Sequence, residues 1–171
     1  GRADLSGLLH ALAARTLHNA SGRAEGPFVV INAAAITPER MEFEMFGIEQ
    51  SNGEQARKPG ALEEAHGGTL FIDEIADMPR ETQNKILRVL VDQTFQRSGG
   101  TAKIHVDVRT ISSTARNLEE EIAEGRFRED LYYRLAGIEL HLPALRERGD
   151  RAELIRSVLA DEGAPGAAVS P

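Results

Sequence analysis

The stretch from Gly67 to Pro79, GGTLFIDEIADMP, limits the possible fold more than any other part of the chain. Its residues 69–72 lack helical spacing and lie between a glycine pair and a turn, which predicts a short strand buried on both faces. Strands of this kind belong to parallel sheets that are covered by helices. Asp73 and Glu74 follow the strand, and ligands of open α/β sheets bind beyond the carboxyl ends of strands. We therefore expect both acids at a ligand site.

An apolar strand followed by Asp-Glu is the Walker B pattern of nucleoside triphosphatases. In those proteins the aspartate helps to hold Mg²⁺, and the glutamate orients and polarises the attacking water. The alternative is a buried strand whose two acids only cap the turn before Pro79. The motif by itself leaves both interpretations open.

The composition fits an ordinary globular domain. Hydrophobic residues make up 41% and charged residues 27% of the 171 residues, enough for one good core. The chain has no cysteine, no apolar run of membrane-spanning length and no signal peptide, so we expect a cytoplasmic protein without a membrane partner. The net charge of −7 argues against indiscriminate nucleic-acid binding. The histidines lack metal-ligand spacing, so any Mg²⁺ is expected to arrive with a nucleotide.

The pattern of apolar residues predicts alternating helices and strands. Helices are predicted over 5–19, 39–46, 80–92, 118–124 (capped by Asn117), 126–135 and 150–162, and strands over 28–31, 69–72, 95–97, 106–113 and 137–142. Residues 48–60 are polar and contain glycine and proline, which predicts an exposed loop, and residues 163–171 are typical of a linker. Strand–helix alternation predicts a parallel sheet covered on both sides.

Motifs in separate parts of the chain, in order and at matching spacing, resemble the AAA+ domain of bacterial enhancer-binding proteins, the sigma-54-dependent response-regulator activators. They are FVVINAAAI (28–36), EMFG (44–47), the stretch 67–79, FREDLYYRL (127–135) and LPALRERGD (142–150). The resemblance covers about residues 12–150. It implies an α/β fold with a parallel-sheet P-loop NTPase (AAA+) core in residues 1–142, covered by helices. Residues 143–171 would hold a hinge, the first helix of a truncated C-terminal helical lid and a loose tail.

The resemblance also implies roles for individual residues. Asp73 would support Mg²⁺, Glu74 would be the hydrolytic base, and Asn32 would hold the glutamate in check until the site is ready. Thr114 stands at the sensor I position and would bond a phosphate or a water. The alternative for Asn32 is a strand-end residue whose carboxamide bonds the backbone of the following turn.

Two arginines match the arginine fingers of the family, which reach into the nucleotide site of the neighbouring subunit. These are Arg128 and Arg134. A planar guanidinium suits the spread charge of a phosphoryl-transfer transition state. The alternative is an exposed ion pair with Glu129 or Asp130, which contributes little to stability.

The chain departs from the family pattern in three places. Gly7 and His10 occupy the positions of a loop glycine and of the phosphate-binding lysine, and a neutral histidine does not replace a permanent ammonium. Ala115 follows Thr114 where the family usually has Asn or His. Residues 48–60 lack the Gly-Ala-Phe-Thr-Gly-Ala signature of the loop that contacts sigma-54. Because it lacks this signature, the chain resembles the NtrX branch of nitrogen-related response regulators.

The resemblance therefore implies the central ATP-binding and ATPase module of a bacterial two-component transcriptional regulator, with ATP and Mg²⁺ as cofactors. Such a module would act as a ring of six or seven copies and reach the RNA polymerase holoenzyme indirectly. It would contact DNA only through another domain. The degenerate phosphate loop leaves an alternative open, an AAA+-shaped module that assembles subunits without hydrolysing ATP.

Overall fold

The computed structural model describes residues 2–49 and 58–137. The chain divides into two compact units, one made of Gly1–Glu25 with Ile138–Pro171 and the other of Gly26–Gly137. Several predictions lie outside the described residues: the middle of the loop 48–60, nearly all of the strand 137–142, the domain boundary after residue 142, the helix 150–162 and the tail 163–171.

The described part of the first unit is helix α1 (Arg2–Ala20) and the turn that follows it. The predicted helix over 5–19 is confirmed, and it begins at Arg2. Leucine and alanine, which are strong helix formers, supply much of its sequence. The helix ends where both the backbone N–H and the hydroxyl of Ser21 donate to the carbonyl oxygen of His18, at 3.1 and 2.7 Å.

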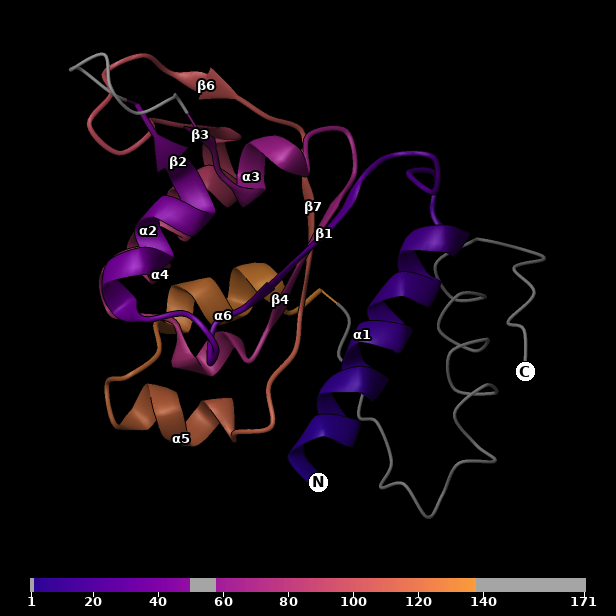
Figure 1. Cartoon of the computed structure of the whole chain (residues 1–171). Helices are drawn as coiled ribbons and strands as arrows, with labels where there is room; N and C mark the ends of the chain where they lie inside the picture. The colour runs from indigo at the N-terminus through magenta and orange to yellow at the C-terminus, as the bar shows by residue number, and fades with distance from the viewer. Residues whose placement is uncertain (1, 50–57, 138–171) are drawn as a thin grey trace. The chain divides into compact units, whose positions relative to one another are not determined.

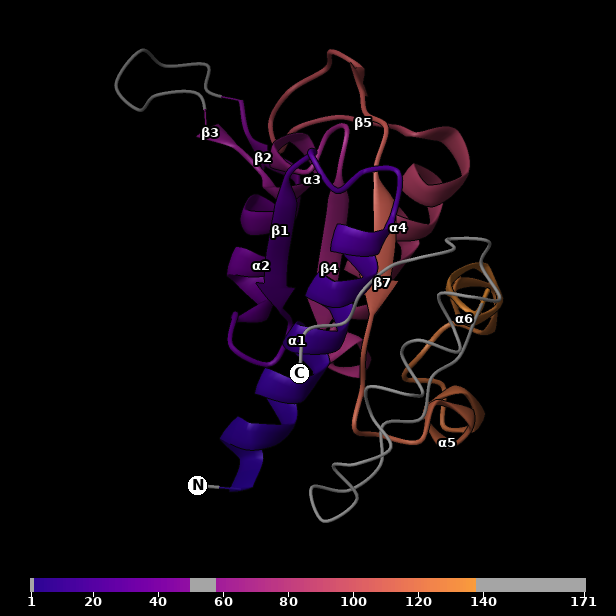
Figure 2. The ribbon, with the colours of Figure 1, turned by 90° about the vertical axis from the view of Figure 1, so that its right-hand side faces the viewer.

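Within the described residues, the second unit is built on three parallel strands, β1 (Phe28–Asn32), β4 (Thr69–Asp73) and β7 (Arg109–Ser112). Their order is β1-β4-β7; Figure 1 labels the three strands, and Figure 2 shows them side by side with β4 in the middle. Every residue of β4 is buried. The register pairs Asn32 with Asp73, so the carboxyl ends of β1 and β4 coincide. The predicted parallel sheet is confirmed.

Helices α2 (Pro38–Phe46), α3 (Ala61–Glu64) and α4 (Arg80–Asp92) share one apolar core with this sheet. The predicted helices over 39–46 and 80–92 are confirmed, and Gly47 ends α2 with a φ of +82° that suits glycine. The sequence does not predict α3, because four residues are too few to show helical periodicity. The core joins side chains of strands and helices: Ile31, Leu70, Ile72, Met41, Met45, Phe46, Leu62, Ile86 and Val89.

Two short antiparallel pairs lie beside the main sheet. Strand β2 (Gly47–Ile48) pairs with β3 (Lys58–Pro59), and β5 (Thr94–Phe95) pairs with β6 (Ile104–His105). The prediction of a continuous exposed loop over 48–60 is therefore wrong at its described ends. The predicted edge strand over 95–97 is displaced to β5. Neither pair is long enough to show the alternation by which a strand is predicted.

A half-buried arginine joins these short strands to α3. The Arg97 guanidinium donates to both carboxylate oxygens of Glu63, at 2.6 and 2.7 Å, and to Glu49 at 2.6 Å. These hydrogen bonds, above all those to Glu63, raise the pKa of Arg97 above its ordinary value. Since Glu49 directly follows β2, the ion pairs tie the end of β2 to α3.

Strand β7 is shorter than the predicted strand over 106–113. The backbone N–H groups of Val106 and Val108 donate to the backbone carbonyl and the side-chain oxygen of Gln93, both at 3.0 Å. These residues are therefore bonded to the end of α4, and pairing with β4 begins only at Arg109. Tertiary hydrogen bonds have overridden a strongly β-prone sequence.

The last two described helices are α5 (Leu118–Ala123) and α6 (Glu129–Leu135). Asn117 caps α5 as predicted, since its side chain accepts the N–H groups of Glu119 and Glu120. The prediction that α6 begins at Arg126 is wrong. The N–H groups of Arg126 and Phe127 donate back to the Glu121 carbonyl oxygen, at 2.9 and 3.2 Å, and hold this segment outside the helix.

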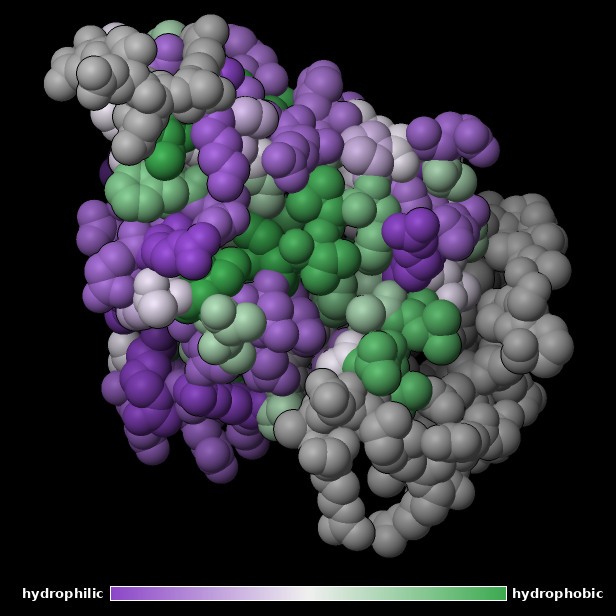
Figure 3. Space-filling model, in the orientation of Figure 1, coloured by the Kyte–Doolittle hydropathy of each residue, from purple (hydrophilic) through white to green (hydrophobic). Residues whose placement is uncertain are grey.

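The surface of the second unit is polar around α5. Figure 3 shows hydrophilic side chains gathered on that side, where Glu119, Glu120 and Glu124 are exposed. None of the helices in the described part of the chain combines the length and the apolar content that a membrane span requires.

Candidate functional site

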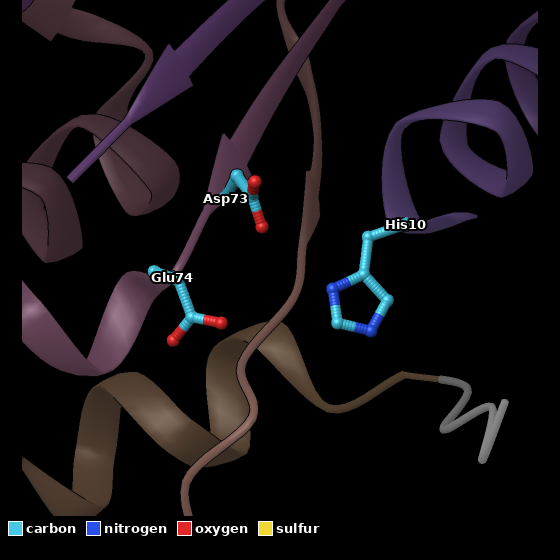
Figure 4. Close-up of side chains that lie close together, drawn as sticks. All are labelled: His10, Asp73 and Glu74. Atoms are coloured by element: carbon cyan, nitrogen blue, oxygen red, sulfur yellow. The ribbon is translucent and has the colours of Figure 1, made fainter. Parts of the chain in front are cut away.

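The two acids of the Walker B pattern lie at the carboxyl end of β4. Asp73 is the last residue of the strand and Glu74 begins the turn after it, as Figure 4 shows; the third labelled residue, His10, belongs to α1. The Asp73 side chain is buried, and its Oδ1 accepts a hydrogen bond from the Ser113 hydroxyl at 2.7 Å. Ser113 directly follows β7, and its backbone bonds Ile72 and Ile75 on either side of the acids, at 3.0 Å each. Strand pairing thus fixes Asp73 in place.

Glu74 has a backbone conformation that is unusual for a residue other than glycine. Its φ and ψ are both 52°, in the left-handed region. Such a conformation costs on the order of 1–3 kcal/mol, and it persists where the surrounding structure imposes it. Its carboxylate accepts the backbone N–H of Ala115, at 3.1 Å to one oxygen and 3.4 Å to the other. The half-buried carboxylate is therefore aimed toward the segment after β7.

Asn32 and Thr114, two further predicted site residues, bond the backbone of their own turns. Asn32 Oδ1 accepts the N–H of Ala34 at 3.0 Å, the contact expected of the strand-end alternative. Thr114 Oγ1 accepts the N–H of Arg116 at 3.1 Å. Asn32 is the last residue of β1 and Thr114 lies two residues after β7, the strands that flank β4, so both lie at the same edge of the sheet as the acids. The role of Asn32 as a restraint on Glu74 stays a prediction.

Gly7 and His10 lie inside α1. Beyond its first turn, an α-helix uses each backbone N–H to bond the carbonyl four residues earlier. The N–H groups of Gly7 to His10 are therefore engaged within the helix and do not form a phosphate-binding loop. His10 also carries no permanent positive charge.

Arg128, the first predicted arginine finger, is held by its own chain. Its Nε and Nη2 donate to the two carboxylate oxygens of Asp130, at 2.8 and 2.7 Å, and its Nη1 donates to Asn84 Oδ1 at 2.6 Å. The hydrogen bonds from Arg128 lower the pKa of Asp130 to about 2. The predicted alternative of an ion pair with Asp130 is thus observed, and it does not exclude a role for Arg128 in an assembly.

The surroundings of Arg128 are open to solvent. It lines a surface hollow of about 520 Å³ together with Arg80, Phe127 and Tyr133. Tyr133 is 68% exposed, an unusual amount for an aromatic side chain. Arg134, the second predicted finger, is exposed as well and donates to the Leu90 carbonyl oxygen at 3.2 Å. Both arginines therefore belong to the surface formed by α4 and α6.

Two features of the site were not evident from the sequence. The Ser113 hydroxyl supports Asp73, and the Ala115 N–H supports Glu74. The side chain of Ala115 offers no hydrogen bond, but its backbone N–H supplies one to Glu74. Both contacts follow from the register in which β4 pairs with β7. That register depends on residues far apart in the sequence, so a local sequence pattern does not predict it.

The oxygen atoms at this edge of the sheet fit Mg²⁺. Two carboxylates and a serine hydroxyl, from Asp73, Glu74 and Ser113, are the hard oxygen donors that Mg²⁺ prefers. Two neighbouring carboxylates repel the phosphates of a nucleotide unless a cation lies between them. The residues therefore fit a nucleotide that arrives with Mg²⁺, whereas the helical Gly7–His10 segment does not fit the role of a phosphate cradle.

Comparison with known proteins gives a consistent picture. The family model described as the sigma-54 interaction domain matches residues 6–141. The nitrogen assimilation regulatory protein NtrX of Azorhizobium caulinodans is 69% identical over 137 residues, which are 80% of this chain and 30% of that protein. The DNA-binding transcriptional regulator NtrC of Escherichia coli K12 is 50% identical over 145 residues, 84% of this chain and 31% of that protein.

Solved structures agree with the sequence relatives. The crystal structure of NtrX from Brucella abortus in complex with ADP matches with a TM-score of 0.76 and 61% identity, covering 89% of this chain and 33% of that one. The ATP complex of the same protein matches with a TM-score of 0.73 and 59% identity, covering 88% and 34%. The chain thus spans about 30% of the length of the curated relatives it matches. It belongs to the sigma-54 interaction domain family, as a relative of the NtrX and NtrC regulators.

Proposed function

We propose that this chain is the central ATP-binding and ATP-hydrolysing module of a bacterial two-component transcriptional regulator. The observation that carries the proposal is the pair of supported acids at the end of β4, Asp73 bonded by Ser113 and Glu74 bonded by Ala115. The nucleotide complexes of Brucella abortus NtrX support it, because that protein is about 60% identical to this chain. Mg²⁺, when bound, neutralises phosphate charge and orients the phosphoryl group.

In this proposal each acid has one task. Asp73, buried and hydrogen-bonded by Ser113, holds the cation at the carboxyl end of β4. Glu74 orients the attacking water and accepts its proton, and the Ala115 N–H keeps the carboxylate aimed while the water is absent. Thr114, just after β7, contacts a phosphate once a nucleotide is present, and Asn32, at the end of β1, contacts the Glu74 carboxylate.

The two arginines would complete the catalytic site of a neighbouring subunit. Arg128 and Arg134 lie on α6 and its amino end, and we propose that they reach the nucleotide of an adjacent copy in a ring of six or seven. A guanidinium then stabilises the negative charge of the transition state. Removal of such an arginine lowers the rate by about 10³- to 10⁵-fold. To do so, Arg128 exchanges Asp130 for a phosphate. Such a ring works in the cytoplasm. It acts indirectly on the RNA polymerase holoenzyme, and it contacts DNA through other parts of the regulator.

The test is ATP hydrolysis by the purified chain, measured over a range of protein concentrations. Glu74→Gln should lower the rate per subunit by about 10²-fold or more, as removal of a general base does, while Glu64→Gln, a change of the same kind at an exposed site on α3, should not. Specific activity should also rise with protein concentration, because each site needs two copies. Equal rates for Glu74→Gln and Glu64→Gln, or no turnover by the unaltered chain at any concentration, would overturn the proposal.

A further inference from the structure

Gln83, in the first turns of α4, is polar and yet fully buried, with no measurable exposure. A buried carboxamide is costly unless its donors and its acceptor are all satisfied. Its Nε2 donates to the carbonyl oxygens of Met78 at 2.8 Å and Arg126 at 3.0 Å, and its Oε1 accepts the backbone N–H of Arg128 at 2.9 Å. One side chain thus uses both of its donors and its acceptor on backbone groups.

The segments that Gln83 joins are the two functional ones. Met78 directly follows the short 3₁₀ helix η1 (Ile75–Asp77), which begins next to Glu74. Arg126 and Arg128 belong to the short segment before α6, and Arg128 is its last residue. The two segments are more than forty residues apart in the sequence. Gln83 itself lies 43 residues before Arg126 and 45 before Arg128. The carboxamide therefore sets the spacing between the turn after Glu74 and the backbone of Arg128.

Charged side chains connect the same two segments a second time. Arg116 pairs with Asp77 of η1 at 2.6 Å, and it lies 3.9 Å from Glu121. Glu121 is buried and accepts two hydrogen bonds from Arg126, at 2.7 and 3.1 Å, which lower the pKa of Glu121. These contacts hold Arg126, whereas Gln83 binds the backbone N–H of Arg128 itself.

The neighbouring residue on α4 completes the support of Arg128. Asn84 accepts from the Arg128 guanidinium while Gln83 accepts from its backbone. Two consecutive residues of one helix thus hold both ends of this arginine. A helix is a rigid support for such a purpose, and a displacement of about 1 Å in a positioning residue can cost about 10²-fold in rate.

We propose that Gln83 is a positioning residue that ties the catalytic turn of one subunit to the arginine which that subunit offers to its neighbour. The inference rests on the proposed function, in which Glu74 acts within a subunit and Arg128 acts on the next one. It assigns Gln83 an effect on turnover in the neighbouring site, and none on nucleotide binding in its own.

Gln83→Met is the test variant, since methionine fills a similar volume without the three hydrogen bonds. Gln93→Met is the matched control. Gln93 lies at the other end of α4, and its carboxamide bonds Val89 and Val108, away from the arginines. Gln83→Met should lower kcat by about tenfold or more and leave the KM for ATP within about twofold, whereas Gln93→Met should leave both nearly unchanged.

Mixed assemblies separate a role in the neighbour from a role within the subunit. Gln83→Met subunits keep Glu74, and Glu74→Gln subunits keep a well-placed Arg128. A mixture of the two should therefore recover activity that neither has alone. No recovery in the mixture, or a raised KM with an unchanged kcat, would overturn the assignment.

A second measurement does not depend on turnover. Hydrogen exchange at the Arg128 amide should be at least about tenfold faster in Gln83→Met than in the unaltered chain, and unaltered in Gln93→Met. Gln83→Asn, whose carboxamide is one methylene too short to reach the Arg128 N–H, should also speed exchange at this amide, and it replaces Gln83→Met if the latter does not fold. If the unaltered chain does not hydrolyse ATP, the proposed function fails, and this exchange measurement alone decides whether Gln83 holds Arg128. Equal exchange rates at Arg128 in all variants would overturn the inference.

Discussion

Individual side chains at the carboxyl end of the sheet are held by short hydrogen bonds from nearby backbone or side-chain groups. Ser113 holds Asp73, the Ala115 N–H holds Glu74, and the Ala34 N–H holds Asn32. Bonds of this kind reduce the reorganisation needed when a charged ligand arrives. The position of the two acids could be predicted, because an apolar strand followed by acids has a local signature. Their supporting groups could not, since they depend on the pairing of β4 with β7.

The ion pair between Arg128 and Asp130 makes the stability of the fold depend on pH. The pKa of Asp130 is lowered from an ordinary value of 3.8 to about 2, chiefly by the hydrogen bonds from Arg128. A depressed pKa means that the pair stabilises the fold at pH values above 3.8, and that this contribution is lost as the pH falls through about 2. The pair therefore does not respond to pH changes near neutrality.

The measurement is the Tm of the unaltered chain and of Asp130→Asn between pH 2 and pH 8. Asparagine keeps an oxygen for the Leu131 N–H that Asp130 accepts at 2.9 Å. We expect a Tm difference of no more than about 4 °C above pH 5, because an exposed pair contributes little to stability, and a smaller difference toward pH 2. A difference that grows as the pH falls would contradict this account.

Among the elements, long periodic helices and the central strand were predictable and the short ones were not. Helix α4 has the predicted bounds, Arg80–Asp92, because its apolar periodicity and starting proline are local features. The segment before α6 has helix-forming residues, yet Gln83 and Glu121 hold its backbone in another conformation. Tertiary hydrogen bonds decide such boundaries, and a sequence pattern does not contain them.

The start of the sheet gives a prediction at the scale of elements. Strands β1 and β4 approach so closely that a β-carbon on Gly68 would overlap the carbonyl oxygen of Pro27, which itself accepts the N–H of Thr69 at 2.9 Å. Gly68→Ala should therefore lower the free energy of unfolding by about 3 kcal/mol or more, since backbone cannot move aside as a flexible side chain does. Urea unfolding followed by circular dichroism measures the loss.

Gly137→Ala is the control for this change, because nothing in the described part of the chain lies within 4 Å of a β-carbon at Gly137. It should change the unfolding free energy by less than about 1 kcal/mol. If Gly68→Ala were as stable as Gly137→Ala, the close approach of the two strands would not exist in solution.

For the molecule as a whole, the family could be recognised from motifs that span most of the chain, and the family model matches residues 6–141. The parallel α/β core follows from the same motifs and from strand–helix alternation. What the sequence left open is nucleotide binding, since it keeps Asp73 and Glu74 but has His10 in the lysine position. The structure sharpens this contrast, because the acids are well supported and Gly7 and His10 lie within a helix.

The most direct test of the central claim is a titration of the purified chain with a fluorescent ATP analogue, with and without Mg²⁺. Asp73→Ala and His10→Lys are measured beside the unaltered chain. We expect saturable binding that requires Mg²⁺. Asp73→Ala should weaken this binding by about tenfold or more, and His10→Lys should strengthen it by adding a permanent positive charge. Absence of binding by the unaltered chain and by His10→Lys at millimolar nucleotide would contradict the account and favour an assembly module that works without ATP.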